Sequence, residues 1–251
     1  MWPPVIQYFI ASEGWRATHI GIGVLCIASM LPLILVLRRP TPRHAIAPGT
    51  TAASHGSLGV SPTTLMVLLC IAAVGCCVAM AMPQVHIVAY CGDLGYGPAR
   101  GAEMLAAMMG FGIISRIGCG FLADRIGSLE TLLAGSALQG LALFLYLWFD
   151  GLVSLYVISA LFGLFQGGIV PMYAIIVREH FSPAETGTRL GIVLMATLIG
   201  MALGGWLSGA IFDLTGSYRS AFLNGLAWNM LNGGIVLWLL LRPRSPRLAT
   251  A

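Results

Sequence analysis

The chain has 251 residues and a formal net charge of +4; 58% of its residues are hydrophobic and only 9% are charged. Because soluble domains carry about 25% charged residues, this composition excludes an ordinary water-soluble fold. It predicts an all-α membrane protein whose surroundings are the lipid bilayer, and we expect no nucleic-acid partner.

Apolar stretches of roughly 20 residues, the length that a helix needs to cross a bilayer, recur along most of the sequence. Helices and closed barrels are the structures that satisfy every backbone polar group in lipid. We therefore expect a polytopic helical bundle of about seven transmembrane helices. In chain order, the predicted spans are 17–37, 63–90, 101–123, 129–149, 152–177, 190–212 and 219–241.

Two segments differ from the predicted spans. Residues 1–16 have no basic stretch before the first apolar run, and they carry Glu13, so they do not resemble a signal peptide. We expect them to face outward or to end a truncated span. Residues 38–62 are rich in Pro, Gly, Ser and Thr, which predicts a flexible linker between the first span and a block of six.

Arginines divide unequally between the two sides of the predicted bundle. The loops on one side hold nine of them, against three on the other side. Cytoplasmic loops carry the excess of positive charge, so we expect the linker 38–62 and the C-terminal tail 243–251 to be cytoplasmic. All thirteen basic residues are arginine, which is typical of a GC-rich bacterial genome and indicates the inner membrane.

The six spans after the linker contain an internal repeat. GFLADRIG at 120–127 matches GAIFDLTG at 209–216 at an offset of 89 residues, and Arg100 before one span matches Arg189 before another. Three crossings separate the two copies, so the sequence predicts an inverted three-plus-three repeat, as in many secondary transporters. The alternative is that glycine-rich membrane helices resemble one another without any repeat.

Two stretches resemble the major facilitator superfamily. GFLADRIG at 120–127 resembles its G-x-L-A-D-R-x-G signature between the eighth and ninth helices. PVIQYFIASEGWRA, which begins at Pro4, is similar to the end of its fifth helix and the start of its sixth. The resemblance covers the whole chain, which corresponds to the fold from late in the fifth helix to its end and lacks the first four helices. It implies that 1–37 end an N-terminal domain with its last helix and that 63–242 form the C-terminal six-helix domain.

The helix that carries the signature is similar to the monocarboxylate transporter and oxalate/formate antiporter branch. In that branch an arginine of the eighth helix meets the substrate carboxylate, and Arg116 in GIISRIGCGFLADRIG occupies its place. Animal-type monocarboxylate porters carry an Asp where Gly112 stands, and the oxalate-type antiporter carries a lysine that the span 190–212 lacks. The resemblance thus implies an organic anion and leaves its identity and the proton coupling open.

The signature also implies a gating motif. Its residues are Gly120, Asp124, Arg125 and Gly127, with Asp213 as the repeat equivalent of Asp124. An Asp at a helix end can accept hydrogen bonds from the N-terminus of a neighbouring helix, where the macrodipole favours negative charge. We expect Asp124 to form such a latch with the start of the sixth span, near Thr186 to Arg189.

Arg116 is unusual because it is a charged residue inside a predicted membrane helix. It lies eight residues before Asp124, about 12 Å deeper along the helix, where a charge costs roughly 2.5 to 3.5 kcal/mol. Gly112 and Gly120 share its face and leave room around it. Its repeat equivalent is Gly205, so the scaffold does not require a charge there. Two interpretations stay open: an anion-binding residue or a tether between helices.

Other polar residues of the spans could line a cavity that binds substrate. In the second span, Gln84 lies near His86 and Tyr90, which share a face of the helix; in the fifth span, Gln166 and Tyr173 share a face. Buried polar residues also hydrogen-bond between membrane helices as structural contacts. That alternative stays open for each of the five.

The sequence contains no constellation typical of catalysis or metal binding. Its six cysteines lie in or beside apolar segments without a CxxC pair, so we expect packing residues, no disulfide framework and no zinc site. It has no HExxH motif and no phosphate-binding loop. We therefore expect neither an enzyme nor a cofactor.

Together these features predict a secondary active transporter that moves a small organic anion, a carboxylate, by alternating access. Its partners would be that anion and either the missing N-terminal helices or a second copy of the chain. The alternative is a remnant: an inactive truncated transporter or a membrane interaction protein. An intramembrane enzyme is a third, more distant interpretation.

Overall fold

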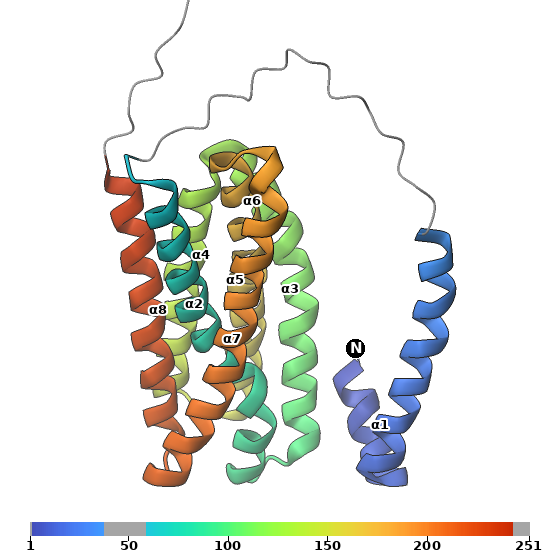
Figure 1. Ribbon diagram of the computed structural model, residues 1–251. Helices are drawn as coiled ribbons and strands as arrows, with labels where there is room; N and C mark the ends of the chain where they lie inside the picture. The colour runs from blue at the N-terminus through green and yellow to red at the C-terminus, as the bar shows by residue number, and fades with distance from the viewer. Residues whose placement is uncertain (1, 38–58, 243–251) are drawn as a thin grey trace, which may run out of the picture.

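The computed structural model describes residues 2–37 and 59–242, and every regular element in these two ranges is an α-helix (Figure 1). Most of the predicted linker 38–62 and all of the tail 243–251 lie outside the described residues. The helices are α1 (Trp2–Leu37), α2 (Pro62–Asp93), α3 (Pro98–Ile126), α4 (Ser128–Trp148), α5 (Leu152–Gln166), α6 (Ile169–His180), α7 (Pro183–Thr215) and α8 (Tyr218–Leu241).

The described residues contain seven helical spans that are long and apolar enough to cross a membrane, which confirms the all-α polytopic fold. Two short helices, α5 and α6, make up one of them, Leu152–His180. Some spans are longer than predicted. The helix expected at 190–212 is α7, which extends from Pro183 to Thr215. Proline occupies the first turn of α2, α3 and α7, where its missing N–H breaks no helical hydrogen bond.

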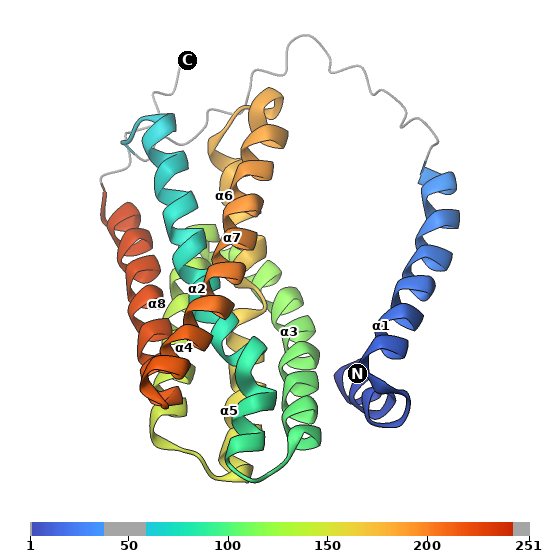
Figure 2. The same ribbon diagram turned by 60° about the horizontal axis from the view of Figure 1, so that its bottom comes forward.

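The first helix, α1, turns back on itself at Gly14. This residue has φ 81° and ψ 159°, a backbone conformation that favours glycine. Figures 1 and 2 show a short arm, 2–13, and a long arm, 15–37, that meet at one end. The short arm is helical, and the turn falls within PVIQYFIASEGWRA, where the family resemblance puts a helix end followed by a helix start.

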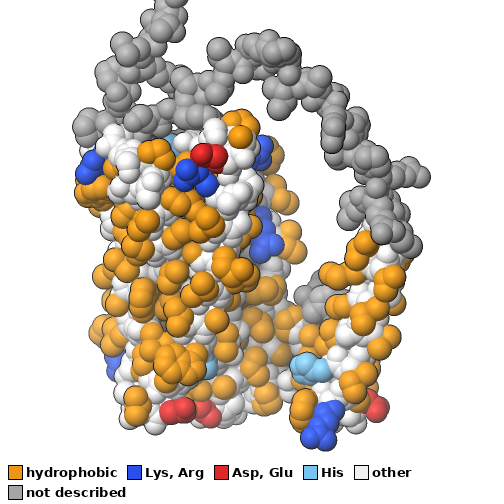
Figure 3. Space-filling model, in the orientation of Figure 1, with side chains coloured by type: hydrophobic (Ala, Val, Ile, Leu, Met, Phe, Trp, Pro, Cys, Tyr) orange, Lys and Arg blue, Asp and Glu red, His pale blue; other side chains and the backbone are white. Residues whose placement is uncertain are grey.

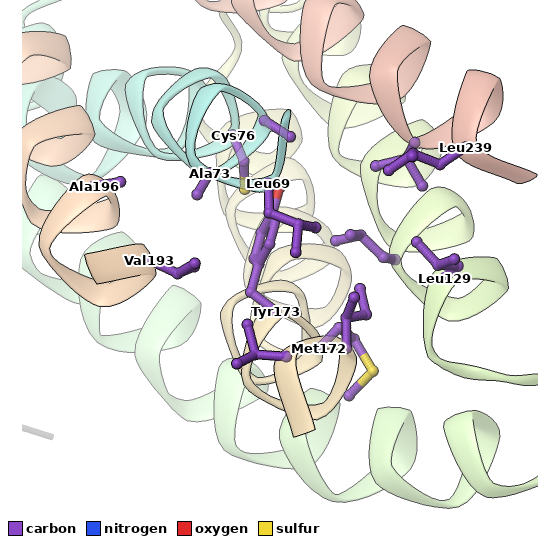
Figure 4. Close-up of a cluster of buried hydrophobic side chains, with 14 of the residues drawn as sticks. Leu69, Ala73, Cys76, Leu129, Met172, Tyr173, Val193, Ala196 and Leu239 are labelled. Atoms are coloured by element: carbon purple, nitrogen blue, oxygen red, sulfur yellow. The ribbon is translucent and has the colours of Figure 1, made fainter. Parts of the chain in front are cut away.

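Helix α2 packs at the centre of the bundle, against α3, α7 and α8, while the α5–α6 span packs against α3 and α4. Buried hydrophobic side chains form two clusters, one around the first half of α2 and one around its second half. Figure 4 shows the first cluster, in which Leu69 of α2, Leu129 of α4 and Tyr173 of α6 lie together. The core therefore follows α2 along its length.

On the face shown in Figure 3, the outer surface of the helices is largely apolar along the middle, most charged side chains gather towards the two ends, and one Lys or Arg group lies between them. This distribution is the one expected for helices whose middle lies in lipid. Among the spans, α1 is the least buried: only 6% of its most apolar stretch is buried inside the protein. It packs against α3.

Candidate functional site

The span made by α5 and α6 is interrupted at Gly167 and Gly168, which keep right-handed helical φ and ψ but belong to neither helix. The cap of α5 is a hydrogen bond from Gly167 N to Gly163 O at 3.1 Å, and α6 begins at Ile169. The predicted span 152–177 is thus present as one membrane span, Leu152–His180, that consists of two helices. A break in a membrane helix frees backbone groups, which neighbouring helices or side chains must satisfy.

Helix α3 is the neighbour at this break, because glycines let the two backbones approach closely. A Cβ atom on Gly163 would overlap the carbonyl oxygen of Met108. A Cβ atom on Gly167 would lie 2.7 Å from the Cα of Gly112, which is too close for any side chain. Both glycines are thus required by the contact between α3 and the broken span.

Arg116 extends from α3 to the break. Its Nε donates a hydrogen bond of 3.4 Å, which is long, to the carbonyl oxygen of Gly167. The side chain lies on an exposed face of α3, and within residues 2–37 and 59–242 it has no carboxylate partner and no other hydrogen bond. Both interpretations keep support: the bond to Gly167 is a tether between helices, and the terminal amino groups remain available to an anion.

Ser115 belongs to the same contact, and the sequence did not single it out. It is 4% exposed, and its Oγ accepts a hydrogen bond from Gly168 N at 3.0 Å. Because Gly167 C=O and Gly168 N–H belong to one peptide unit, two successive residues of α3 bind both polar groups of that unit. One sequence signal could have found Ser115: it is a polar neighbour of Arg116 in an otherwise apolar and glycine-rich stretch.

Gln166 and Tyr173, expected to share one face, lie on opposite sides of the break. Gln166 is buried at the end of α5, and its Oε1 has no hydrogen-bond partner in the described part of the chain. Tyr173 is buried in α6, and its hydroxyl donates to Asn232 Oδ1 at 2.7 Å. Asn232 Nδ2 in turn donates to Ser136 Oγ at 2.7 Å. Tyr173 thus fits the structural alternative, whereas Gln166 stays a candidate.

The polar residues of α2 contact helices on its other side. His86 Nε2 lies 3.0 Å from the carbonyl oxygen of Gly205 on α7. The ring centroid of Tyr90 lies 4.9 Å from that of Tyr218 on α8, and Gln84 is half-buried. None of these contacts reaches the α5–α6 break, so His86 and Tyr90 also fit the structural alternative.

The gating motif lies at the end of α3. Asp124 is exposed, and no hydrogen bond to its carboxylate is found within the described ranges. The partners expected for it bond inside their own helix: Thr186 Oγ1 donates to Ser182 O at 2.8 Å, and Arg189 Nε donates to Glu185 Oε2 at 3.0 Å. The expected latch between Asp124 and the start of α7 is therefore not formed in this conformation.

The other residues of the motif have simple local environments. Gly127 joins α3 to α4 with φ 104°, which favours glycine. Arg125 stands in the last turn of α3, where the macrodipole favours a cation. Gly120 borders open space, and Asp213 is exposed in the last turn of α7. A role for these residues in gating stays a prediction.

The described residues hold no cluster of His, Cys, Asp or Glu side chains that could bind a metal ion. Their ion pairs, Arg100–Glu103 and Arg189–Glu185, each join neighbouring turns of one helix. The chemistry available at the break is thus hydrogen bonding and one permanent positive charge, that of Arg116.

Comparison with known proteins agrees with this architecture. The sequence profile of the Major Facilitator Superfamily matches residues 2–158 and 104–251. The chain is 26% identical to monocarboxylate transporter 13 of Rattus norvegicus over 243 residues, which cover 94% of this chain and 55% of that protein. It is 28% identical to monocarboxylate transporter 11 of Homo sapiens over 255 residues, covering 93% of this chain and 50% of that protein.

A bacterial relative shows the same pattern. The chain is 28% identical over 221 residues to the uncharacterized MFS-type transporter YcxA of Bacillus subtilis (strain 168), covering 82% of this chain and 52% of that protein. The chain thus spans about half the length of the curated relatives it matches. Because the two matches to the family profile together extend from residue 2 to residue 251, the chain belongs to the Major Facilitator Superfamily, with monocarboxylate transporters among its relatives.

Proposed function

We propose that this protein acts in secondary active transport of a small carboxylate by alternating access, with Arg116 as its anion-binding residue. Membership of the superfamily supports a transporter, and similarity to proteins named monocarboxylate transporters supports a carboxylate. The organisation of the break between α5 and α6 supports a binding site in the middle of the bundle, where helix interruptions in transporters often lie.

The observation that carries this proposal is the environment of Arg116. Its guanidinium stays protonated at physiological pH, lies within a membrane span, and has a backbone carbonyl as its one partner among the described residues. A bound carboxylate would neutralise the charge and accept two parallel hydrogen bonds. Because Nε is bound to Gly167 O, the two terminal amino groups are the donors left for such a pair.

Gln166 is the second residue that we assign to the site. It is buried directly before Gly167, and its Oε1 lacks a hydrogen-bond partner in the described ranges. Leaving such a group unpaired is unfavourable, so a hydrogen-bond donor in the site would stabilise it.

We assign residues 1–37 to the end of an N-terminal domain, 38–62 to a linker, 63–242 to a six-helix domain and 243–251 to a tail. The exposed apolar surface of α1 and the half-length match to relatives support this division. The second wall of the transport path would then come from helices outside this sequence or from a second copy of the chain.

The half-length match also favours a second candidate function. A chain that supplies one wall of a transport path would be an inactive truncated transporter by itself, or a membrane protein that interacts with other helices. Measuring transport as well as binding separates the transporter from the inactive chain, because one wall of a transport path can bind a carboxylate weakly without moving it across the membrane. Saturable uptake by the purified chain alone in proteoliposomes would contradict the second candidate.

Binding of radiolabelled pyruvate to the purified chain in lipid nanodiscs tests the role of Arg116. Arg116→Gln removes a charged donor pair and should weaken binding about ten- to hundredfold. Arg116→Lys keeps the charge but loses the planar fork, so its loss should be smaller. Arg219→Gln is the matched control, because Arg219 is exposed at the start of α8 and its loss should leave affinity unchanged.

Two outcomes decide the matter. Wild-type affinity of Arg116→Gln for pyruvate, acetate and oxalate would show that Arg116 is a tether and not an anion-binding residue. Failure of the wild-type chain to bind any of the three would support the truncated transporter or interaction protein instead.

We also propose that the protein lies in the inner membrane with its C-terminus in the cytoplasm. Arg125 and Arg178 lie in the last turns of α3 and α6, and Arg242 follows α8; these three helices end on the same side of the bundle, as the positive-inside rule requires. With the native cysteines replaced, Ser182→Cys should react with impermeant maleimide only from the cytoplasmic side, and Ser217→Cys only from outside. The reverse pattern in intact cells would overturn the orientation.

A further inference from the structure

We propose that Ser115 is a positioning residue that fixes the guanidinium of Arg116 by holding the Gly167–Gly168 peptide unit. The inference rests on the proposed function for its effect on carboxylate binding. The positioning itself concerns contacts between α3 and the broken span, so it can be tested without a substrate.

The peptide unit at the break is held from two directions. In a trans peptide the C=O and N–H groups point in opposite directions. Ser115 Oγ accepts from the Gly168 N–H at 3.0 Å, and Arg116 Nε donates to the Gly167 carbonyl at 3.4 Å. Successive residues of a helix point about 100° apart, which lets α3 present an acceptor on its buried side and a donor on its exposed side.

Ser115 supplies the hydrogen-bond partner that the Gly168 N–H needs inside a membrane. In a continuous helix the N–H of Gly168 would bond to the carbonyl four residues earlier; here α5 ends at Gln166 and the N–H bonds to Ser115 instead. An unpaired N–H inside lipid is strongly unfavourable. Without the Ser115 hydroxyl, the N–H loses its partner and the peptide unit is free to rotate, which would move the Gly167 carbonyl.

The position of the Gly167 carbonyl in turn decides how Arg116 is presented. A guanidinium bound through Nε has a fixed plane, and its two terminal amino groups then point away from the carbonyl as a preformed fork. Fixing a flexible side chain before the ligand arrives lowers the entropy lost on binding. Ser115 therefore raises carboxylate affinity without touching the carboxylate.

The contact leaves little space for another side chain at position 115. A Cβ atom on Gly167 would lie 2.8 Å from Ser115 Cβ, so the two helices touch at this point. Ser115→Thr would add a methyl group to this contact, whereas Ser115→Cys keeps the unbranched shape and replaces the oxygen with a larger and weaker acceptor. Ser115→Cys is thus the conservative variant, and Ser115→Ala removes the acceptor.

Hydrogen exchange of the purified chain in lipid nanodiscs tests the first link. Mass spectrometry of peptides that span 163–170 reports on the Gly168 amide. Ser115→Ala should speed its exchange about three- to tenfold, the factor expected from one lost hydrogen bond. Arg116→Gln should speed it as well, because the same peptide unit loses its other partner.

Ser136→Ala is the matched control for exchange and for binding. Ser136 is 1% exposed and accepts a hydrogen bond from Asn232, so this variant also removes one buried hydroxyl. It acts between α4 and α8, and exchange in 163–170 should not change. An effect as large as that of Ser115→Ala, or no effect of Ser115→Ala, would overturn the positioning role.

Pyruvate binding tests the second link. With Arg116 intact, Ser115→Ala should weaken binding about three- to tenfold, Ser115→Cys should weaken it less, and Ser136→Ala should leave it unchanged. Faster exchange with unchanged pyruvate affinity would overturn the link to Arg116. If the wild-type chain binds no pyruvate, the proposed function fails, and the exchange results still decide the positioning. If Ser115→Ala does not insert, Ser115→Cys carries both tests.

Discussion

Two helix crossings in this bundle are built alike but differ in chemistry. At the α2–α7 crossing, Gly204 packs so closely that a Cβ atom on it would lie 2.6 Å from the carbonyl oxygen of Val78. At the α3–α5 crossing, Gly163 and Gly167 bring the broken span onto α3 with similar closeness. The first crossing joins two unbroken helices, whereas the second contains the break and a charged residue.

The sequence positions of the two crossings are related. Val74 and Val78 of α2 pack against glycines of α7, and the positions 89 residues further on are Gly163 and Gly167, which pack against α3. The inverted repeat itself stays a prediction. His86 contacts the carbonyl of Gly205, the equivalent of Arg116 in that predicted repeat, without any charge at that position. Close packing is common to both crossings, whereas the interruption and the arginine occur only at the α3–α5 crossing.

The largest expected effect comes from the glycines that make the crossings possible. Gly163→Ala should lower the free energy of unfolding by about 1–3 kcal/mol, because its Cβ would overlap the backbone of α3, and Gly204→Ala should do the same at the other crossing. Thermal unfolding in detergent measures both. Gly205→Ala is the control, since its Cβ would lie 3.5 Å from the nearest atom of Val85. A cost at Gly163 no larger than at Gly205 would contradict the close contact.

A smaller effect should follow from removing the anchor of α6, the half-helix after the break. Tyr173→Phe leaves Asn232 Oδ1 without its donor and should lower the free energy of unfolding by about 1 kcal/mol. Pyruvate affinity should not change, because the hydroxyl binds within the core. Tyr90→Phe is the control: its hydroxyl forms no hydrogen bond within the described ranges. A tenfold loss of affinity in Tyr173→Phe would instead make this residue part of the site.

The smallest effect is expected at the unbroken crossing. His86→Leu removes the contact with the carbonyl of Gly205, and hydrogen bonds between membrane helices average about 0.6 kcal/mol. Unfolding of the variant in detergent should show a loss of that size, with pyruvate binding unaltered. Gln84→Leu, at a half-buried neighbour, should cost less. Loss of binding in His86→Leu would show that the α2–α7 crossing carries substrate chemistry too.

The sequence predicted the spans well because their signal is strong. Runs of about 20 apolar residues have one stable arrangement in lipid, and all seven are present in the described residues. Arg116 was found for the same reason, since a charge stands out in such a run. The turn at Gly14 also lay within a stretch that the family resemblance described as a helix end and a helix start.

The break and Ser115 could not be found in the same way. Apart from Gln166, the residues around Gly167 and Gly168 are apolar, and glycine pairs in membrane helices more often mark close packing than a helix end. Serine is common in membrane helices, and its role here depends on which backbone group lies opposite it. The latch expected for Asp124 is not formed in this conformation and stays a prediction, because it depends on the position of α7 relative to α3, which no local pattern determines.

The break has a consequence for how the chain is made. Helix α5 has 15 residues and α6 has 12, so each is shorter than the roughly 20 residues that cross a bilayer. The span Leu152–His180 must therefore enter the membrane as one unit, and before it meets α3 a continuous helix satisfies its backbone best. During synthesis α3 emerges first, so Ser115 and Arg116 are already in the bilayer when the later span arrives. We therefore expect the interruption at Gly167 to form during assembly, when the new span docks on a helix that is already in place.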